Sequence, residues 1–149
     1  MSSCFFIGHR DAAEELLPRI SAAVETLIHK EGVTDFYVGS RGRFDRLAAA
    51  AVRRLMETYS EVRLYRVLAY LPTEADDRLA EGFSGTVYPE GLERVPRRFA
   101  VPQANRAMVD ACGFLIAYAP HATGNARKVV DYARRKGRRV IEVKDRGVC

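Results

Sequence analysis

Short apolar segments that each run into a glycine-bearing polar turn constrain the fold of this chain most strongly. The three turns span residues 8–10, 39–42 and 120–125. After each turn, residues compatible with a helix follow, with apolar positions at the spacing of one helical face. Strands that alternate with helices through short connections build right-handed crossovers and a parallel sheet. The sequence therefore predicts an α/β, three-layer Rossmann-like fold with a mostly parallel, roughly five-stranded sheet and helices on both faces.

The expected elements follow from apolar runs, helical spacing and stop signals. Strands are expected at residues 3–8, 34–39, 62–70, 113–118 and 138–143, with a short strand at 86–88. Helices are expected at residues 11–31, 43–58, 99–112 and 124–136. Asp11 is the expected N-cap of the first helix, because Glu14 follows it as in a capping box. Gly32 is a natural C-terminal stop for the same helix.

Residues 71–98 break this alternation. The segment is rich in Pro, Gly and acidic residues. A long irregular stretch inside a compact domain is usually functional or mobile. We interpret it as a flap beside a ligand pocket, and the alternative is an inert surface insertion. The chain as a whole, residues 1–149, is predicted to be a single ligand-binding domain.

Positive charge is concentrated near the C-terminus. The chain carries a net charge of +5, and residues 119–149 hold nine of its 24 Lys and Arg residues but three of its 19 acidic residues. A basic segment of this kind suits contact with phosphates or with nucleic acid. The alternative is a solvated helix face whose cations complement the helix dipole.

Cysteine usage and the absence of long apolar runs favour a cytoplasmic protein. The three cysteines are odd in number and lack metal-like spacing, which fits a reducing compartment. No run approaches the ~20 apolar residues that a membrane span needs, and the N-terminus does not read as a secretory signal. His9, His29 and His121 show no ligand spacing, so we expect no metal site and no cofactor.

The first two turns carry groups that suit anions. Gly8 allows close approach of the backbone to a ligand, and Arg10 offers a planar fork for phosphate or carboxylate. His9 is either a donor in the site or a hydrogen-bonded structural residue. The second turn, residues 39–42, places Ser40 and Arg41 between two glycines, as in a backbone nest for phosphate, although it lacks the Lys of a P-loop.

Three later positions have two interpretations each. Asp45 either complements the dipole of the second helix or contacts a ribose or base. Asn105 lies near the buried side of its helix, where its amide needs partners, and it either reaches the pocket or bonds within the helix packing. Thr123 is the expected N-cap of the last helix, whose first N–H groups, at Gly124 and Asn125, are placed to hold a phosphate.

Parallel strands bind ligands beyond their carboxyl ends, so the three turns are expected to form one polar pocket. The candidate ligand-binding residues are Gly8, His9, Arg10, Gly39, Ser40, Arg41, Gly42, Asp45, Asn105, Thr123, Gly124 and Asn125.

Taken in order, these motifs resemble the SLOG superfamily of Rossmann-like proteins, and within it the YpsA-like branch. The resemblance covers almost the whole chain. It depends on residues 6–10, on 39–45 before an alanine-rich helix, on 105–110, and on 123–125 followed by Tyr-Ala and Lys-Gly.

The resemblance implies a pocket for nucleotides or nucleotide-derived ligands. The superfamily includes the LOG phosphoribohydrolases, the DprA family of single-stranded DNA binders and sensor domains of nucleotide signalling. The LOG enzymes carry a Pro-Gly-Gly-x-Gly-Thr-x-x-Glu loop, which matches Pro120 through Lys128 here. Gly124 takes the place of the later Gly and Asn125 that of Thr, while Lys128 stands at the position of the catalytic Glu.

Three functions are therefore expected in descending order. The first is a sensor or regulatory module that binds a nucleotide-type small molecule. The second is an N-glycosidic-bond hydrolase, for which Asp45 or Asp110 would supply the carboxylate that stabilises an oxocarbenium-like state. The third is single-stranded nucleic-acid binding by the basic C-terminal region, with Tyr118 and Tyr132 as the nearby aromatic residues. A homodimer is a further expectation, since cyclic dimers are the commonest oligomers.

Overall fold

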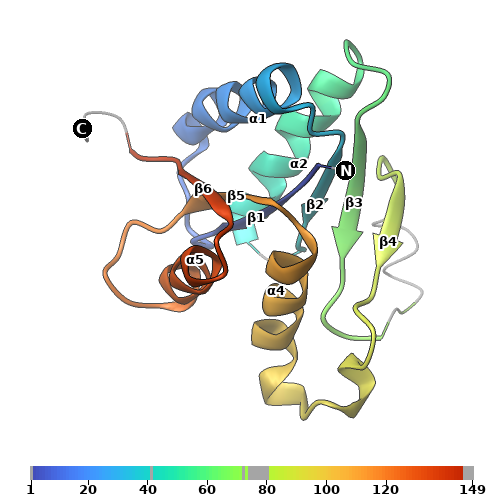
Figure 1. Ribbon diagram of the computed structural model, residues 1–149, viewed down its shortest axis with the longest axis vertical. Helices are drawn as coiled ribbons and strands as arrows, with labels where there is room; N and C mark the ends of the chain where they lie inside the picture. Colours follow the sequence, from blue (N-terminus) through green and yellow to red (C-terminus); the bar gives the residue numbers. More distant parts are fainter. Residues whose placement is uncertain (1, 41, 72, 74–80, 146–149) are drawn as a thin grey trace.

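The computed structural model describes residues 2–40, 42–71, 73 and 81–145. Its sheet has six strands, all paired in parallel, in the order β4-β3-β2-β1-β5-β6 (Figure 1). The strands are β1 (Ser3–Gly8), β2 (Asp35–Val38), β3 (Arg63–Val67), β4 (Gly85–Val87), β5 (Phe114–Tyr118) and β6 (Arg139–Glu142). The predicted α/β, Rossmann-like fold is confirmed. The sheet has six strands rather than five because the short β4 pairs with β3.

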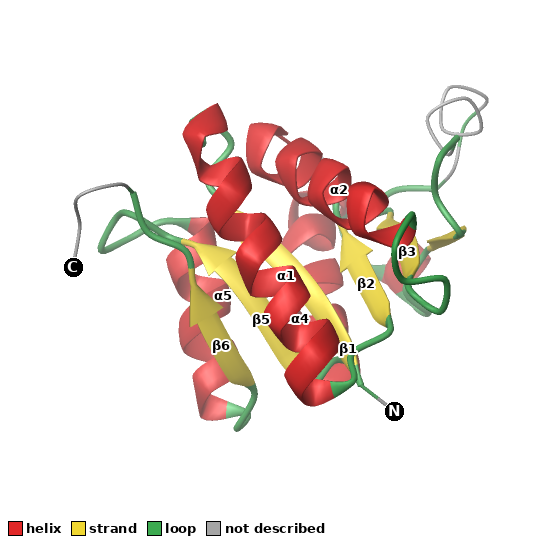
Figure 2. Cartoon of the chain, turned by 90° about the horizontal axis from the view of Figure 1, so that it is seen from above, coloured by secondary structure: helices red, strands yellow, loops and turns green. Residues whose placement is uncertain are grey.

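Helices cover both faces of the sheet and complete the three layers. Figure 2 shows α1 and α2 on one face, with α4 and α5 behind the sheet. The four helices are α1 (Leu17–Glu31), α2 (Gly42–Met56), α4 (Ala100–Ala111) and α5 (Asn125–Arg135). Each face has its own core: one includes Ile20, Phe36 and Val52, and the other Phe5, Met108 and Val130. The two apolar faces of the strands therefore hold one helical layer each.

The first helix begins later than the sequence predicted. A 3-10 turn at Glu14–Leu16 precedes α1, whose N-cap is Leu16 rather than Asp11. The main-chain N–H of Asp11 instead donates to Nδ1 of His9 (3.2 Å), and Ala12 is fully buried. Because residues 9–12 form a turn of their own, the expectation that the first helix begins at Asp11 is wrong.

The cap of the last helix also differs from the prediction. The N-cap of α5 is Gly124, at φ 105° and ψ 176°, and no side chain of the described residues caps it. Thr123 therefore does not have the capping role that the sequence favoured. Only glycine adopts such a backbone readily, so Gly124 is required by conformation. The first N–H groups of α5 are left to other partners.

The strand order reverses beside β1. From β1 the chain moves outward through β2, β3 and β4, and then returns to place β5 on the other side of β1. Gly8 and Tyr118 are register partners, so the turns that follow β1 and β5 leave the sheet side by side. Ligands of open α/β sheets bind at such a switch point, outside the carboxyl ends of the strands.

The segment 71–98 is more regular than predicted where the structure describes it. It contains β4 and two 3-10 turns, Leu92–Arg94 and Arg97–Phe99, and Leu92 is buried. Residues 72 and 74–80 of the expected flap lie outside the described residues. Within the part of the chain that is described, no helix has the length and apolar character needed to cross a membrane.

Candidate functional site

A cavity of about 830 Å³ lies at the switch point, and we call it the switch-point cavity. Its walls come from the ends of β1 and β5, the turn after β2, the first turns of α2 and α5, and one face of α4. The residues predicted from the sequence that line it are Gly8, His9, Arg10, Gly39, Ser40, Gly42, Asp45, Asn105, Thr123, Gly124 and Asn125. Arg41 lies outside the described residues.

Main-chain hydrogen bonds at His9 join the first turn to the third. The N–H of His9 donates to the carbonyl of Tyr118 (3.1 Å), and the carbonyl of His9 accepts from Ala12 (3.2 Å). Its Nδ1 accepts from Asp11, so in the neutral ring the proton lies on Nε2. Its ring meets that of His121 edge to face, with centroids 4.9 Å apart. His9 is therefore both hydrogen-bonded and part of the cavity wall.

The first and second turns pack backbone against backbone. The N–H of Arg43 donates to the carbonyl of Arg10 (2.9 Å), and its guanidinium donates to the carbonyl of Ala12 (3.4 Å). Gly42 has φ 86°, and a Cβ there would lie 2.6 Å from the Cα of Arg10. Gly42 is thus required both for its backbone conformation and for the contact between the two turns.

Packing alone requires a glycine at position 8. A Cβ at this position would lie 2.2 Å from Cγ of Phe44 and within 2.7 Å of two further ring atoms. Phe44 is fully buried and stacks on Tyr118 with ring centroids 6.2 Å apart. The absence of a side chain at Gly8 lets α2 approach the end of β1.

The second turn passes close to the carboxylate of Asp45. A Cβ on Gly39 would lie 3.0 Å from Oδ2 of Asp45, so the turn is tight against this side chain. Asp45 is buried, with 9% of its surface exposed, and lies in the first turn of α2. A negative charge is favourable there because of the helix dipole. Among the described residues that line the cavity, Asp45 is the one carboxylate.

Asn105 brings an unpartnered amide into the wall of the cavity. The residue is 8% exposed, and its Nδ2 has no hydrogen-bond partner among the described residues. A buried donor without a partner costs about 1–3 kcal/mol. Among the described residues, this amide nitrogen makes no bond within the helix packing, and Asn105 lines the cavity.

Two helix N-termini in the wall of the cavity favour negative charge. The first residues of α2 and α5, Gly42 and Asn125, both line it. The N–H groups and partial positive charge of two helix N-termini therefore lie in the wall of the cavity. Arg10 is exposed, and no carboxylate of the described chain pairs with its guanidinium. The arrangement suits a phosphate or carboxylate.

Apolar residues that the sequence interpretation missed form the remaining wall. They include Phe5, Phe6, Ile7, Val67, Ala69, Val101, Ala104, Ala119 and Ala126. Val101 and Ala104 had a signal in the sequence, because they share the helical face of Asn105 at spacings of one, three and four residues. Val67 and Ala69 had none, since only the sheet order brings the end of β3 to this site.

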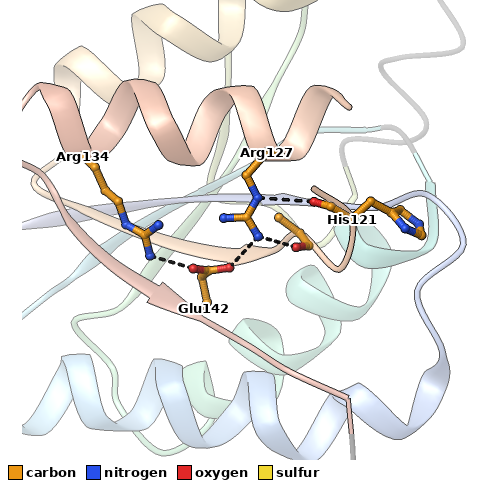
Figure 3. A network of polar contacts seen from close by, with 5 residues as sticks. His121, Arg127, Arg134 and Glu142 are labelled. Carbon is orange, nitrogen blue, oxygen red and sulfur yellow. Dashed lines mark hydrogen bonds and ion pairs between the residues drawn. The ribbon is translucent and has the colours of Figure 1, made fainter. Parts of the chain in front are cut away.

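Arg127 holds the third turn in place and was also missed. Its guanidinium donates to the carbonyls of Ala119 (2.6 Å) and His121 (3.3 Å) and pairs with Glu142 (3.1 Å), as Figure 3 shows. Arg134 binds the other oxygen of Glu142 at 2.6 Å. Burial opposes ionisation of Glu142, but the hydrogen bonds from the two arginines outweigh it and lower the pKa of this carboxyl.

Asp110, the other carboxylate considered from the sequence, does not line the switch-point cavity. It is exposed near the end of α4, where its Oδ1 accepts a hydrogen bond from the hydroxyl of Tyr132 (2.8 Å) and lies 4.0 Å from Nζ of Lys136. Asp110 is thus separated from the residues with which it would have to act.

Comparison with known proteins supports the fold of this chain. No family model matches the chain, and no curated protein matches it. Among solved structures, the chain is similar to DNA processing protein A (DprA) from Streptococcus pneumoniae, with a TM-score of 0.70 and 16% sequence identity. The likeness covers 99% of this chain and 52% of the other, so the chain spans about half the length of that protein. At this identity the likeness shows a shared Rossmann-like fold.

Proposed function

We propose that the protein binds a nucleotide or nucleotide-derived ligand in the switch-point cavity, as a sensor or regulatory module. The observation that carries the proposal is the unpartnered, buried amide of Asn105 in a wall of this cavity. Two helix N-termini and Arg10 also line this cavity. The helix N-termini and Arg10 suit an anionic group, and the apolar wall with Asn105 suits a flat ring that carries a hydrogen-bond acceptor. A nucleotide has both parts. The volume is within the usual range of small-molecule sites, roughly 300–1,000 Å³.

We also infer that the chain belongs to the SLOG superfamily and its YpsA-like branch. The order of the sequence motifs supports this inference, and so does the fold shared with DprA. Members of that branch would be expected to hold the phosphate with main-chain N–H groups. Because Lys128 stands where a catalytic Glu would be, this proposal favours binding over turnover.

A thermal-shift screen with nucleotides, nucleotide sugars and signalling dinucleotides tests the proposal directly. A ligand at ~100 times its Kd stabilises the protein by about 2.7 kcal/mol. For a domain of this size we expect a Tm higher by about 5–10 °C. A panel that leaves the Tm unchanged would overturn the proposed function.

Two variants separate a binding role from a structural one. Asn105→Leu keeps the volume and removes an unsatisfied donor, so we expect the unliganded Tm to stay the same or rise while affinity falls. Arg10→Ala changes an exposed side chain and is expected to weaken binding by roughly 10- to 100-fold. Arg19→Ala on α1 removes the same charge from an exposed position outside the cavity and is the matched control.

A second candidate function is hydrolysis of the N-glycosidic bond of a nucleotide. Asp45 favours it, because an oxocarbenium-like transition state needs a nearby carboxylate and Asp45 lines the cavity. Incubation with nucleoside monophosphates, followed by chromatography for free base, is the assay. A hydrolase of this kind predicts that wild type releases base and that Asp45→Asn releases none. A full panel without release in the wild type would exclude the hydrolase.

A further inference from the structure

A second hollow lies outside the cavity, between the outer faces of α4 and α5. It has a volume of about 310 Å³, and we call it the α4/α5 groove. The two helices lie next to each other on the same face of the sheet (Figure 1). The residues that line the groove are Pro102, Arg106, Asn125, Lys128, Val129, Asp131, Tyr132 and Arg135.

The groove is positively charged. Arg106, Lys128 and Arg135 contribute three cations, and Asp131 is the one acidic residue among the described residues that line it. Across the described chain, no carboxylate lies within 4.0 Å of any of these three cations. Cations without acidic partners beside a hollow complement an anionic occupant.

An aromatic ring lies among these cations with a fixed orientation. The hydroxyl of Tyr132 donates to Asp110 (2.8 Å), which holds the ring in place. The charged groups of Arg106, Lys136 and Arg135 lie 5.5, 5.6 and 6.0 Å from the ring centroid. A half-buried ring among cations is the arrangement with which proteins stack a base and neutralise the adjacent phosphate.

The groove and the switch-point cavity share a wall. Asn125, the first residue of α5, lines both hollows. On α4, Val101 and Asn105 line the cavity, while their chain neighbours Pro102 and Arg106 line the groove. A ligand that leaves the cavity over the first turn of α5 therefore enters the groove.

We propose that the α4/α5 groove binds the second unit of a nucleotide chain whose terminal nucleotide occupies the switch-point cavity. The phosphate between the two units lies near Arg106 and Lys128, and the second base stacks on Tyr132. This inference rests on the proposed function. It narrows the ligand from nucleotides in general to chains of two or more units.

Isothermal titration calorimetry with three probes tests this inference. The probes are the four deoxynucleoside 5′-monophosphates, then the dinucleotide and the hexanucleotide of the base that binds best. For the wild type we expect the dinucleotide to bind at least tenfold more tightly than the mononucleotide. A hexanucleotide no tighter than the dinucleotide indicates a site that ends at the second unit, and a tighter one indicates a strand that continues.

The double variant Arg106→Gln/Lys128→Gln removes two exposed cations of the groove. We expect mononucleotide affinity to be unchanged, while the dinucleotide loses its advantage. For the hexanucleotide, the slope of log K against log salt should become shallower by about 0.7, because the two cations contact the same phosphate of a single strand. The double variant Arg19→Gln/Lys30→Gln on α1 removes the same charge from the other face of the sheet and is the control.

Variants of Tyr132 test the stacking contact. Tyr132→Leu is expected to weaken dinucleotide binding by roughly 5- to 150-fold, the range for loss of one base–aromatic contact. Tyr132→Phe keeps the ring and loses the bond to Asp110, so it should retain most of the affinity. Equal losses in the two variants would assign the effect to the hydroxyl and overturn the stacking role.

The outcomes separate this inference from the proposed function. If mononucleotides bind and the dinucleotide binds no more tightly, the proposed function stands and the inference fails. Equal effects of the groove and control variants would also refute it. If no probe binds at millimolar concentration, the inference is overturned, while the proposed function is decided separately by the wider thermal-shift panel.

Discussion

Replacing Gly8 by Ala tests whether this glycine serves packing or ligand approach. The new Cβ would lie 2.2, 2.4 and 2.7 Å from three ring atoms of Phe44, where carbon atoms normally stay about 3.5–4.0 Å apart. The ring would therefore have to move by more than about 1 Å. Phe44 is fully buried and stacked on Tyr118, so it has little room to do so.

The expected destabilisation is at the upper end of the range for overpacked cores, about 3 kcal/mol. In a chain of this length that lowers the Tm by about 6–12 °C. With a urea m-value of about 2 kcal/mol/M, the midpoint of unfolding falls by about 1.5 M. Circular dichroism during thermal and urea unfolding measures both quantities.

Gly113→Ala is the matched control. No atom lies within 4 Å of a Cβ at Gly113, and its φ is outside the left-handed region, so the change should leave stability nearly unaffected. In a Phe44→Leu background, Gly8→Ala should cost much less than in the wild type, because the clashing ring is gone. If Gly8→Ala is within about 0.5 kcal/mol of Gly113→Ala, the packing explanation is refuted.

Three further predictions concern single positions. Gly124→Ala should cost about 1–3 kcal/mol in urea unfolding, although no atom would touch the new Cβ, because φ 105° strains any other residue; a variant as stable as wild type would contradict this. The lowered pKa of Glu142 means that its ionised form stabilises the fold above the unfolded pKa and that this contribution is lost as pH falls through the folded pKa. Glu142→Gln should therefore be less stable than wild type at pH 7 and approach it near pH 3, and a gap independent of pH would argue against the reasoning. Burial and the bond to Asp145 raise the pKa of Tyr118 to about 12, so the contribution of Tyr118 to stability is present below pH 10 and lost between about pH 10 and 12. Absorbance of tyrosinate at high pH should show a late-titrating component that Tyr118→Phe reduces; an unchanged titration curve would be inconsistent with this.

The fold was predictable because its strands are short apolar runs with clear ends. Residues 114–118 are nearly all apolar, as a strand covered on both faces must be, and Gly32 ends α1 in the left-handed conformation that was expected. The start of α1 was not predictable in the same way. Asp11 is a residue type that favours the N-cap position. In the structure, however, its main-chain N–H donates to the ring of His9. This bond depends on the tertiary position of the turn, which the sequence does not show.

The candidate site was partly predictable for a geometric reason. Residues that follow parallel strands meet at one edge of the sheet, so the turns at 8–10 and 39–42 could be placed together without knowing the strand order. Arg127 could not be found this way, because its partners are main-chain carbonyls that carry no sequence signal. The packing requirement at Gly8 could not be predicted either, because the sequence does not show that Phe44 lies against this position.

The contacts of Arg127 determine which positions of the third turn can be changed by mutation. Two of its three acceptors are main-chain oxygens, at Ala119 and His121, and the third is Glu142 on the neighbouring strand. The path of the loop therefore depends little on which side chains it carries at positions 120–123. This short stretch can be randomised in a library while Arg127, Glu142 and Gly124 are kept. Such a library would vary what the pocket recognises without rebuilding its framework.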